Sequence, residues 1–176
     1  DVDSEAEAMA CVDAIGECPW VKIGKQLFTR CGPAVVRRVR ERGKRVFLDL
    51  KFHDIPNTVN RAVAAAVDLG VGMVNVHATG GRRMIEAARR AVEGSETKLL
   101  AVTVLTSLSD EMLRDELGLQ ETAAEAVARL AKLAAESGAH GLICSPQEIA
   151  TVREAAGRSA LIVTPGVRPA WAQQDD

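Results

Sequence analysis

Six short segments rich in Val, Ile and Leu recur along the chain, and longer stretches with helical periodicity separate them. The expected strands span residues 20–23, 45–50, 73–77, 99–105, 141–144 and 160–164. Most are continuously apolar, which is typical of strands in a parallel sheet that is covered on both faces. Helical periodicity is clearest at residues 57–69 and in the stretch that begins near Gln120. This alternation predicts a single α/β domain over residues 1–176.

Two α/β architectures fit that alternation. A doubly wound dinucleotide-binding sheet would carry a G-x-G-x-x-G loop after its first strand, but Gly70-Val71-Gly72 is only part of that pattern and precedes a strand. Charged residues instead crowd the carboxyl ends of several expected strands, where (β/α)₈ barrels carry their active sites. The sequence therefore favours a (β/α)₈ TIM barrel. Because such barrels have eight strands and rarely fall below about 200 residues, we expect most of the first strand and the last strand to be missing.

Composition and residue spacing indicate which partners the protein binds and in which cellular compartment it resides. Lys and Arg number 22 and Asp and Glu 24, so the net charge of −2 gives no global reason to bind nucleic acid. No apolar run approaches the roughly 20 residues of a membrane helix, so we expect no membrane partner. The three histidines lack metal-ligand spacing, and no metal site is expected. The cysteines form no C-x-x-C pair and are expected to be reduced, mostly buried thiols of a cytoplasmic protein; they are Cys11, Cys18, Cys31 and Cys144.

The strongest chemical signal is the segment 47–58, which reads FLDLKFHDIPNT. Side chains at positions i and i+2 of a strand share a face, so Asp49 and Lys51 should point the same way at the strand's carboxyl end. Asp54 follows in the loop. Lys22 ends the preceding strand. Because neighbouring parallel strands lie about 4.8 Å apart, we expect Lys22 to reach Asp49 and Lys51. A structural ion-pair network would be the ordinary explanation of a D-x-K pattern, but four converging charges at this end of a barrel favour an active site.

The same residues resemble a known family. Blocks at 21–25, 49–58, 74–78, 104–107 and 164–169 look like orotidine 5′-phosphate decarboxylase, in order and over nearly the whole chain. The block 49–58 is the most specific. The resemblance implies a (β/α)₈ barrel and a homodimer. It also implies decarboxylation of orotidine 5′-monophosphate to UMP, the last step of de novo pyrimidine biosynthesis, without a cofactor.

The resemblance also implies a role for individual residues. Lys51 matches the lysine that delivers a proton to C6, and Asp49 matches the aspartate beside the substrate carboxylate. Lys22 matches the lysine that holds this aspartate and contacts the ribose. Asp54 matches the aspartate contributed across the dimer interface, as part of the segment 54–58. The implied substrate-binding positions are Asp1, Ile55, Thr58, Thr106 and Arg168.

Two other functions remain open at this point. A sister barrel enzyme with the same D-x-K-x-x-D pattern, such as a sugar-phosphate decarboxylase or aldolase, would use Mg²⁺ held by additional carboxylates. Here Leu48, and not Glu, precedes Asp49. Alternatively, an inactive truncated barrel could serve only as a binding or assembly module, with an unpaired strand edge and an open core.

Overall fold

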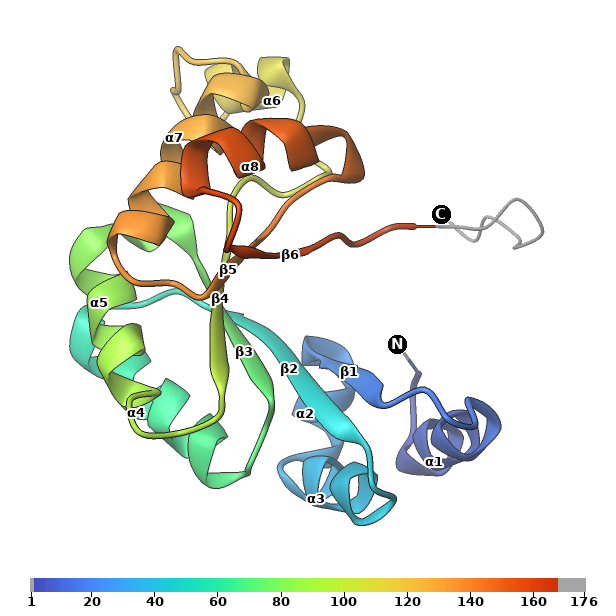
Figure 1. Ribbon diagram of the computed structural model, residues 1–176. Helices are drawn as coiled ribbons and strands as arrows, with labels where there is room; N and C mark the ends of the chain where they lie inside the picture. Colours follow the sequence, from blue (N-terminus) through green and yellow to red (C-terminus); the bar gives the residue numbers. More distant parts are fainter. Residues whose placement is uncertain (1, 168–176) are drawn as a thin grey trace.

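The strands form one curved parallel sheet, in a computed structural model that describes residues 2–167 (Figure 1). The sheet has the sequential order β1-β2-β3-β4-β5-β6, and every neighbouring pair is parallel. The strands are β1 (Trp20–Gly24), β2 (Arg45–Phe52), β3 (Met73–His77), β4 (Lys98–Val102), β5 (Gly141–Ile143) and β6 (Leu161–Val163). All six expected strands are confirmed, and together they form an open half-barrel of the TIM type.

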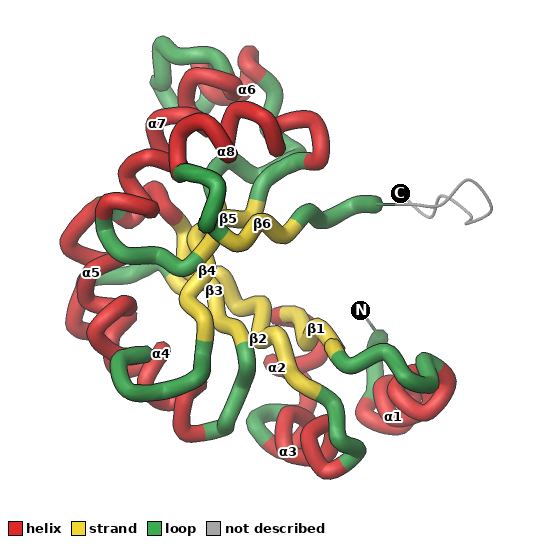
Figure 2. The backbone as a smooth tube through the Cα atoms, in the orientation of Figure 1, coloured by secondary structure: helices red, strands yellow, loops and turns green. Residues whose placement is uncertain are grey.

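The helices lie on the outer side of the curved sheet, where Figure 2 shows them around the strands. They are α1 (Glu5–Ala14), α2 (Lys25–Cys31), α3 (Ala34–Glu41), α4 (Pro56–Asp68), α5 (Arg82–Ala91), α6 (Asp110–Asp115), α7 (Ala123–Glu136) and α8 (Ile149–Ala156), with short 3₁₀ turns η1 (Ala78–Gly80) and η2 (Pro146–Glu148). The two helices expected from periodicity correspond to α4 and α7. Pro56 begins α4 because its fixed φ and missing N–H suit a first helical position.

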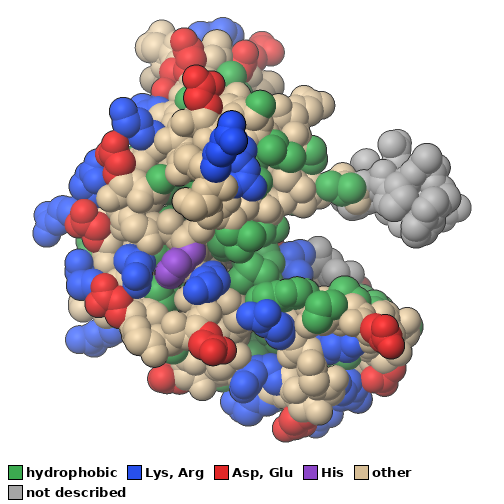
Figure 3. Space-filling model, viewed as in Figure 1, with side chains coloured by type: hydrophobic (Ala, Val, Ile, Leu, Met, Phe, Trp, Pro, Cys, Tyr) green, Lys and Arg blue, Asp and Glu red, His purple; other side chains and the backbone are tan. Residues whose placement is uncertain are grey.

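Side chains alternate between the two faces of each strand, and both faces are apolar. In β2, Val46 and Leu48 belong to the core between sheet and helices, whereas Phe47 faces the inside of the half-barrel. The inner cluster consists of Phe47, Leu100, Val102 and Ile143, with Trp20, Met73 and Val163 packed against it. Figure 3 shows hydrophobic side chains in the opening between the part of the molecule that carries β1 and the part that carries β6. Apolar burial on both faces explains why the strands read as continuous hydrophobic runs.

Two expectations need correction. β4 ends at Val102 and not at residue 105, although Thr103 still donates its N–H to the Ile143 carbonyl (3.1 Å). The cysteines are not mostly buried: Cys144 is buried, but Cys11 and Cys18 are exposed. Cys11 lies on α1, which buries only one side against the rest of the chain.

A helix that crosses a membrane must be both long and apolar. In residues 2–167, no helix has both properties.

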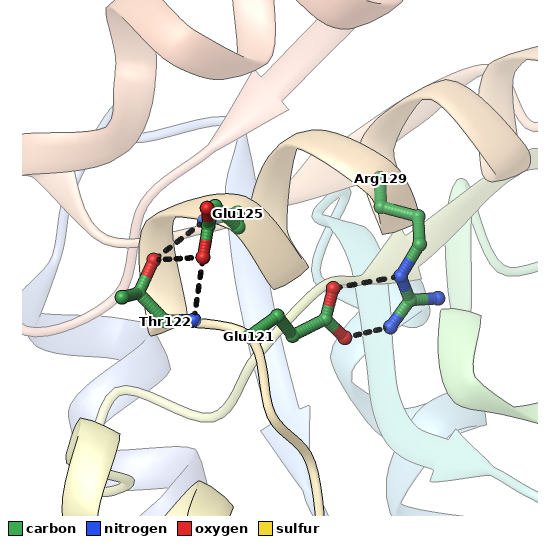
Figure 4. Close-up of polar contacts among 4 residues, drawn as sticks. All are labelled: Glu121, Thr122, Glu125 and Arg129. Carbon is green, nitrogen blue, oxygen red and sulfur yellow. Dashed lines mark hydrogen bonds and ion pairs between the residues drawn. The ribbon is translucent and has the colours of Figure 1, made fainter.

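Helix α7, which packs outside β5, starts with a reciprocal cap (Figure 4). The Glu125 N–H donates to the Thr122 hydroxyl (3.3 Å), and the Thr122 N–H donates to the Glu125 carboxylate (2.8 Å). These two bonds satisfy backbone donors that the first turn of a helix leaves without partners. Glu121 adds an ion pair to Arg129, whose Nε lies 2.9 Å from a Glu121 oxygen.

We expect Thr122→Ala to lower the free energy of unfolding by about 1 kcal/mol, because the side-chain acceptor of the cap is lost. For a chain of this size that corresponds to a melting temperature lower by roughly 2–4 °C. Thermal unfolding followed by circular dichroism measures the change. Thr122→Ser keeps the hydroxyl and serves as the control. Equal melting temperatures for the Ala and Ser variants would contradict the assigned cap.

Candidate active site

Three of the four expected charges meet at the carboxyl ends of β1 and β2. Lys51 Nζ lies 2.7 Å from Asp49 Oδ1, and Lys22 Nζ lies 3.5 Å from Asp49 Oδ2. The Asp49 side chain is only 12% exposed. A carboxylate that is withdrawn from water in this way requires charged or hydrogen-bonding partners. Asp49 therefore forms the centre of the cluster, with an ammonium group on each of its oxygens.

The backbone of Lys51 departs from regular strand geometry. Its φ of 51° lies in the left-handed region, and it is the one non-glycine residue with positive φ in the part of the chain that is described. The register between β2 and β3 shifts at the same place, because Leu48 pairs with Val74 while Phe52 pairs with Val76. A left-handed conformation costs a non-glycine residue about 1–2 kcal/mol, and such strain concentrates at functional sites. The contact with Asp49 thus depends on an irregular strand end.

Asn75 on β3 connects the two catalytic candidates and is fully buried, with 0% exposure. Its Nδ2 donates to Asp49 Oδ1 (2.7 Å), and its Oδ1 accepts the backbone N–H of Lys51 (2.7 Å). Asn75 was not among the site residues expected from the sequence. The available signal was a polar side chain in the middle of a buried apolar strand, since buried polar groups are nearly always hydrogen-bonded.

Opposing effects act on the Asp49 carboxyl. Burial raises its pKa, but the hydrogen bonds from Lys51 and Asn75 and the positive charges of Lys51 and Lys22 together outweigh burial, so the pKa lies below its ordinary value. Asp49 is therefore ionised at neutral pH and has no proton to give. In the Lys51–Asp49 pair, Lys51 is therefore the group that carries a transferable proton.

Two further titratable groups lie near this cluster. Burial lowers the pKa of His77, and electrostatic interactions with His53, Lys25 and Lys51 lower it further and outweigh the opposing effect of Asp49, so His77 is neutral at neutral pH. The His53 and His77 rings lie 5.6 Å apart between centroids. Burial raises the pKa of the Cys144 thiol to about 11, which keeps it protonated. Neither His77 nor Cys144 therefore adds a charge to the site at neutral pH.

A cavity of about 520 Å³ opens beside the charged cluster at the carboxyl ends of the strands. Lys22, Asp49 and Lys51 line one side of it. The apolar wall comes from the inner cluster, and Thr106 and Thr164 add hydroxyl groups. A volume of this size suits a small-molecule ligand.

A second cavity, of about 410 Å³, lies at the opposite end of the strands and includes Arg40, Lys44 and Arg45. These cations already have partners: Arg40 donates to the Leu69 carbonyl (3.2 Å), and Lys44 donates to the Cys18 carbonyl (3.0 Å). The carboxyl end carries the acid–base cluster and is also the catalytic face of TIM barrels. The 520 Å³ cavity is therefore the candidate active site.

The remaining expected site residues differ in position. Thr106 lines the cavity. Asp54 is exposed, and its carboxylate accepts the N–H of Ile55 (2.6 Å). Ile55 is 66% exposed, and Thr58 is exposed in the first turn of α4. In this single chain, none of these three lines the cavity of the described residues. The other two predicted positions, Asp1 and Arg168, lie outside the described residues.

Known proteins have sequences and a fold similar to those of this chain. The family model described as orotidine 5′-phosphate decarboxylase / HUMPS family matches residues 1–176. An orotidine 5′-phosphate decarboxylase of Saccharophagus degradans is 51% identical over 100% of this chain and 75% of its own length. One from Halorhodospira halophila is 58% identical over 89% of this chain and 66% of its own length.

A solved structure agrees with these relatives. The crystal structure of orotidine 5′-phosphate decarboxylase from Lactobacillus acidophilus matches with a TM-score of 0.90 and 44% identity, covering 97% of this chain and 80% of that one. Family model, sequence relatives and fold all lead to the same assignment. This chain belongs to the orotidine 5′-phosphate decarboxylase / HUMPS family.

Proposed function

We propose that this protein decarboxylates orotidine 5′-monophosphate to UMP, the last step of de novo pyrimidine biosynthesis, as a cytoplasmic enzyme that needs no cofactor. The observation that carries the proposal is the Lys51–Asp49 ion pair of 2.7 Å, which lines a cavity at the catalytic end of the half-barrel. Membership of a family whose relatives bear this name supports the same reaction.

The reaction places the greatest demand on Lys51. When the bond between C6 and the carboxylate breaks, CO₂ leaves and its bonding electron pair stays on C6, where no adjacent group can delocalise it. A fixed ammonium beside C6 stabilises that charge, most strongly in a site with few waters. The ammonium then donates its proton to the C6 electron pair, which gives UMP and leaves a neutral amine that regains a proton from water.

Asp49 and Lys22 set the field in which Lys51 acts. Asp49 carries a negative charge and would lie beside the departing carboxylate, so it disfavours the bound substrate more than the transition state, in which that negative charge is leaving. Lys22, on the other oxygen of Asp49, holds this carboxylate in place and lines the cavity, where it would contact the ribose of the substrate. The apolar wall would contact the flat face of the pyrimidine.

The proposal includes a homodimer that exchanges the segment 54–58. Ile55 is 66% exposed at a position where a large apolar side chain gains from being covered. Asp54 is exposed beside it and would complete the Lys–Asp–Lys–Asp array of the neighbouring subunit. Neither nucleic acid nor a membrane surface is a partner in this proposal.

We expect Lys51→Ala to lower kcat by at least about 10³-fold, because both the electrostatic stabilisation of C6 and the proton donor are lost. The assay follows the ultraviolet absorbance of orotidine 5′-monophosphate as it is consumed. Lys132→Ala, an exposed lysine on α7, is the matched control and should keep the parent rate. Circular dichroism checks that both variants are folded. A folded Lys51→Ala variant with near-parental turnover would refute the role assigned to Lys51, whereas a folded parent protein without turnover would favour an inactive assembly module.

We expect turnover to be unchanged after dialysis against EDTA, and unchanged again when Mg²⁺ is added back, because the proposed steps use only side chains. The competing Mg²⁺-dependent sugar-phosphate enzyme needs additional carboxylates near Asp49, but the preceding position is Leu48, which is 1% exposed in the core between sheet and helices. The rate of substrate loss, measured before and after chelation, separates the two. Activity on orotidine 5′-monophosphate that disappears with EDTA and returns with Mg²⁺ would contradict the cofactor-free mechanism, and Mg²⁺-dependent activity on a sugar phosphate alone would favour the sister enzyme.

A further inference from the structure

We infer that Asn75 is a positioning residue for the decarboxylation, because it fixes the Lys51 backbone and the Asp49 carboxylate in one arrangement. The inference deepens the proposed function and rests on it. Asn75 is fully buried and does not line the cavity among the described residues, so it acts on the reaction through its two neighbours and does not touch the substrate.

The Asn75 amide oxygen holds the backbone of Lys51. Where β2 leaves its regular register with β3, the Lys51 N–H donates to the Asn75 side chain at 2.7 Å. Asn75 lies between Val74 and Val76, the two β3 residues that flank the irregularity. Its amide oxygen therefore supplies the acceptor that the shifted register leaves open, and it supports the left-handed conformation of Lys51.

The Asn75 amide nitrogen holds the carboxylate of Asp49. Asn75 Nδ2 and Lys51 Nζ both donate to Asp49 Oδ1, each at 2.7 Å. The Asn75 amide oxygen thus accepts the backbone N–H of Lys51, and the amide nitrogen donates to Asp49, which is the partner of the Lys51 side chain. An amide can do this because it offers a donor and an acceptor on one rigid plane. A serine or threonine hydroxyl also donates and accepts, but from a single atom, whereas the amide places the donor and the acceptor on two separate atoms.

Several other titratable groups surround Asp49 and Asn75, and they could also contribute to a pH profile. Lys22 on β1 and Lys51 on β2 contact Asp49, and His77 lies two residues after Asn75 on β3, with His53 and Lys25 acting on it. Cys144 at the end of β5 lines the same cavity. Because these groups remain in every variant below, each variant is compared with the parent protein at the same pH.

Two substitutions test the inference. Asn75→Ala removes both hydrogen bonds and should lower kcat about 10- to 100-fold, the effect of losing bonds to a charged group, with KM little changed. Asn75→Asp keeps the shape but places two carboxyls in contact. Such a pair retains one proton well above the ordinary pKa of an aspartate. The singly protonated pair reproduces the donor to Asp49, so the rate should approach the parent at acidic pH and fall as pH rises.

Asn60 provides the matched control. It is half-buried and donates to the Ala87 carbonyl at 2.7 Å, between α4 and α5 and away from the cavity. Asn60→Ala and Asn60→Asp should change stability without changing kcat or its pH profile. If the Asn75 variants behave as these controls do, with parental kcat at every pH, Asn75 has only a structural role and the inference is overturned.

A second measurement does not depend on turnover. The ¹³C shift of the Asp49 carboxyl, followed by NMR over pH, reports its pKa directly. In Asn75→Ala this pKa should rise relative to the parent protein, because a hydrogen bond that favours the charged form is lost. An unchanged titration overturns the inference. If the parent protein does not consume orotidine 5′-monophosphate, the proposed function fails, while this titration still decides whether Asn75 controls Asp49.

Discussion

The site depends on one buried carboxylate and the donors that compensate its lost hydration. Asp49 receives hydrogen bonds from Lys51 and Asn75 on one oxygen and an ion pair from Lys22 on the other. Removing a carboxylate from water costs several kcal/mol unless its oxygens are occupied. Three neighbouring strands supply these partners, so the charge can be kept only when β1, β2 and β3 are correctly assembled. Folding and the catalytic arrangement are therefore linked through Asp49.

The parallel sheet explains why these groups converge. Parallel strands end at the same edge, and their inward side chains share a layer. Below that layer, Phe47, Leu100 and Val102 fill the inside with apolar atoms. They exclude water below the charged groups and so lower the local dielectric constant. An ammonium above such a floor interacts more strongly with a developing negative charge than it would in water.

The strands and the main contact could be predicted from the sequence because both depend on local pattern. Continuous apolar runs indicated the six strands, and the D-x-K spacing indicated that Asp49 and Lys51 meet. The D-x-K spacing predicts this contact for a regular strand, however, whereas Lys51 has a left-handed backbone with a register shift beside it. Such an irregularity depends on Asn75, which is 24 residues away in sequence. No periodicity within one strand can reveal it. The role proposed for Asp54 likewise depends on a second subunit, which one chain does not contain.

The side chains of Lys22 and Lys51 are still partly exposed to water, and substrate binding would have to displace that water. The Lys51 side chain is 28% exposed and that of Lys22 is 43% exposed, whereas Asp49 is 12% exposed. Water therefore still screens the ammonium groups more than it screens the carboxylate. A ligand that fills the cavity would displace that water and strengthen every interaction in the cluster at once. Because the groups are already held in place by the strand ends, little reorganisation accompanies this change, and preorganisation of this kind is a major source of electrostatic catalysis.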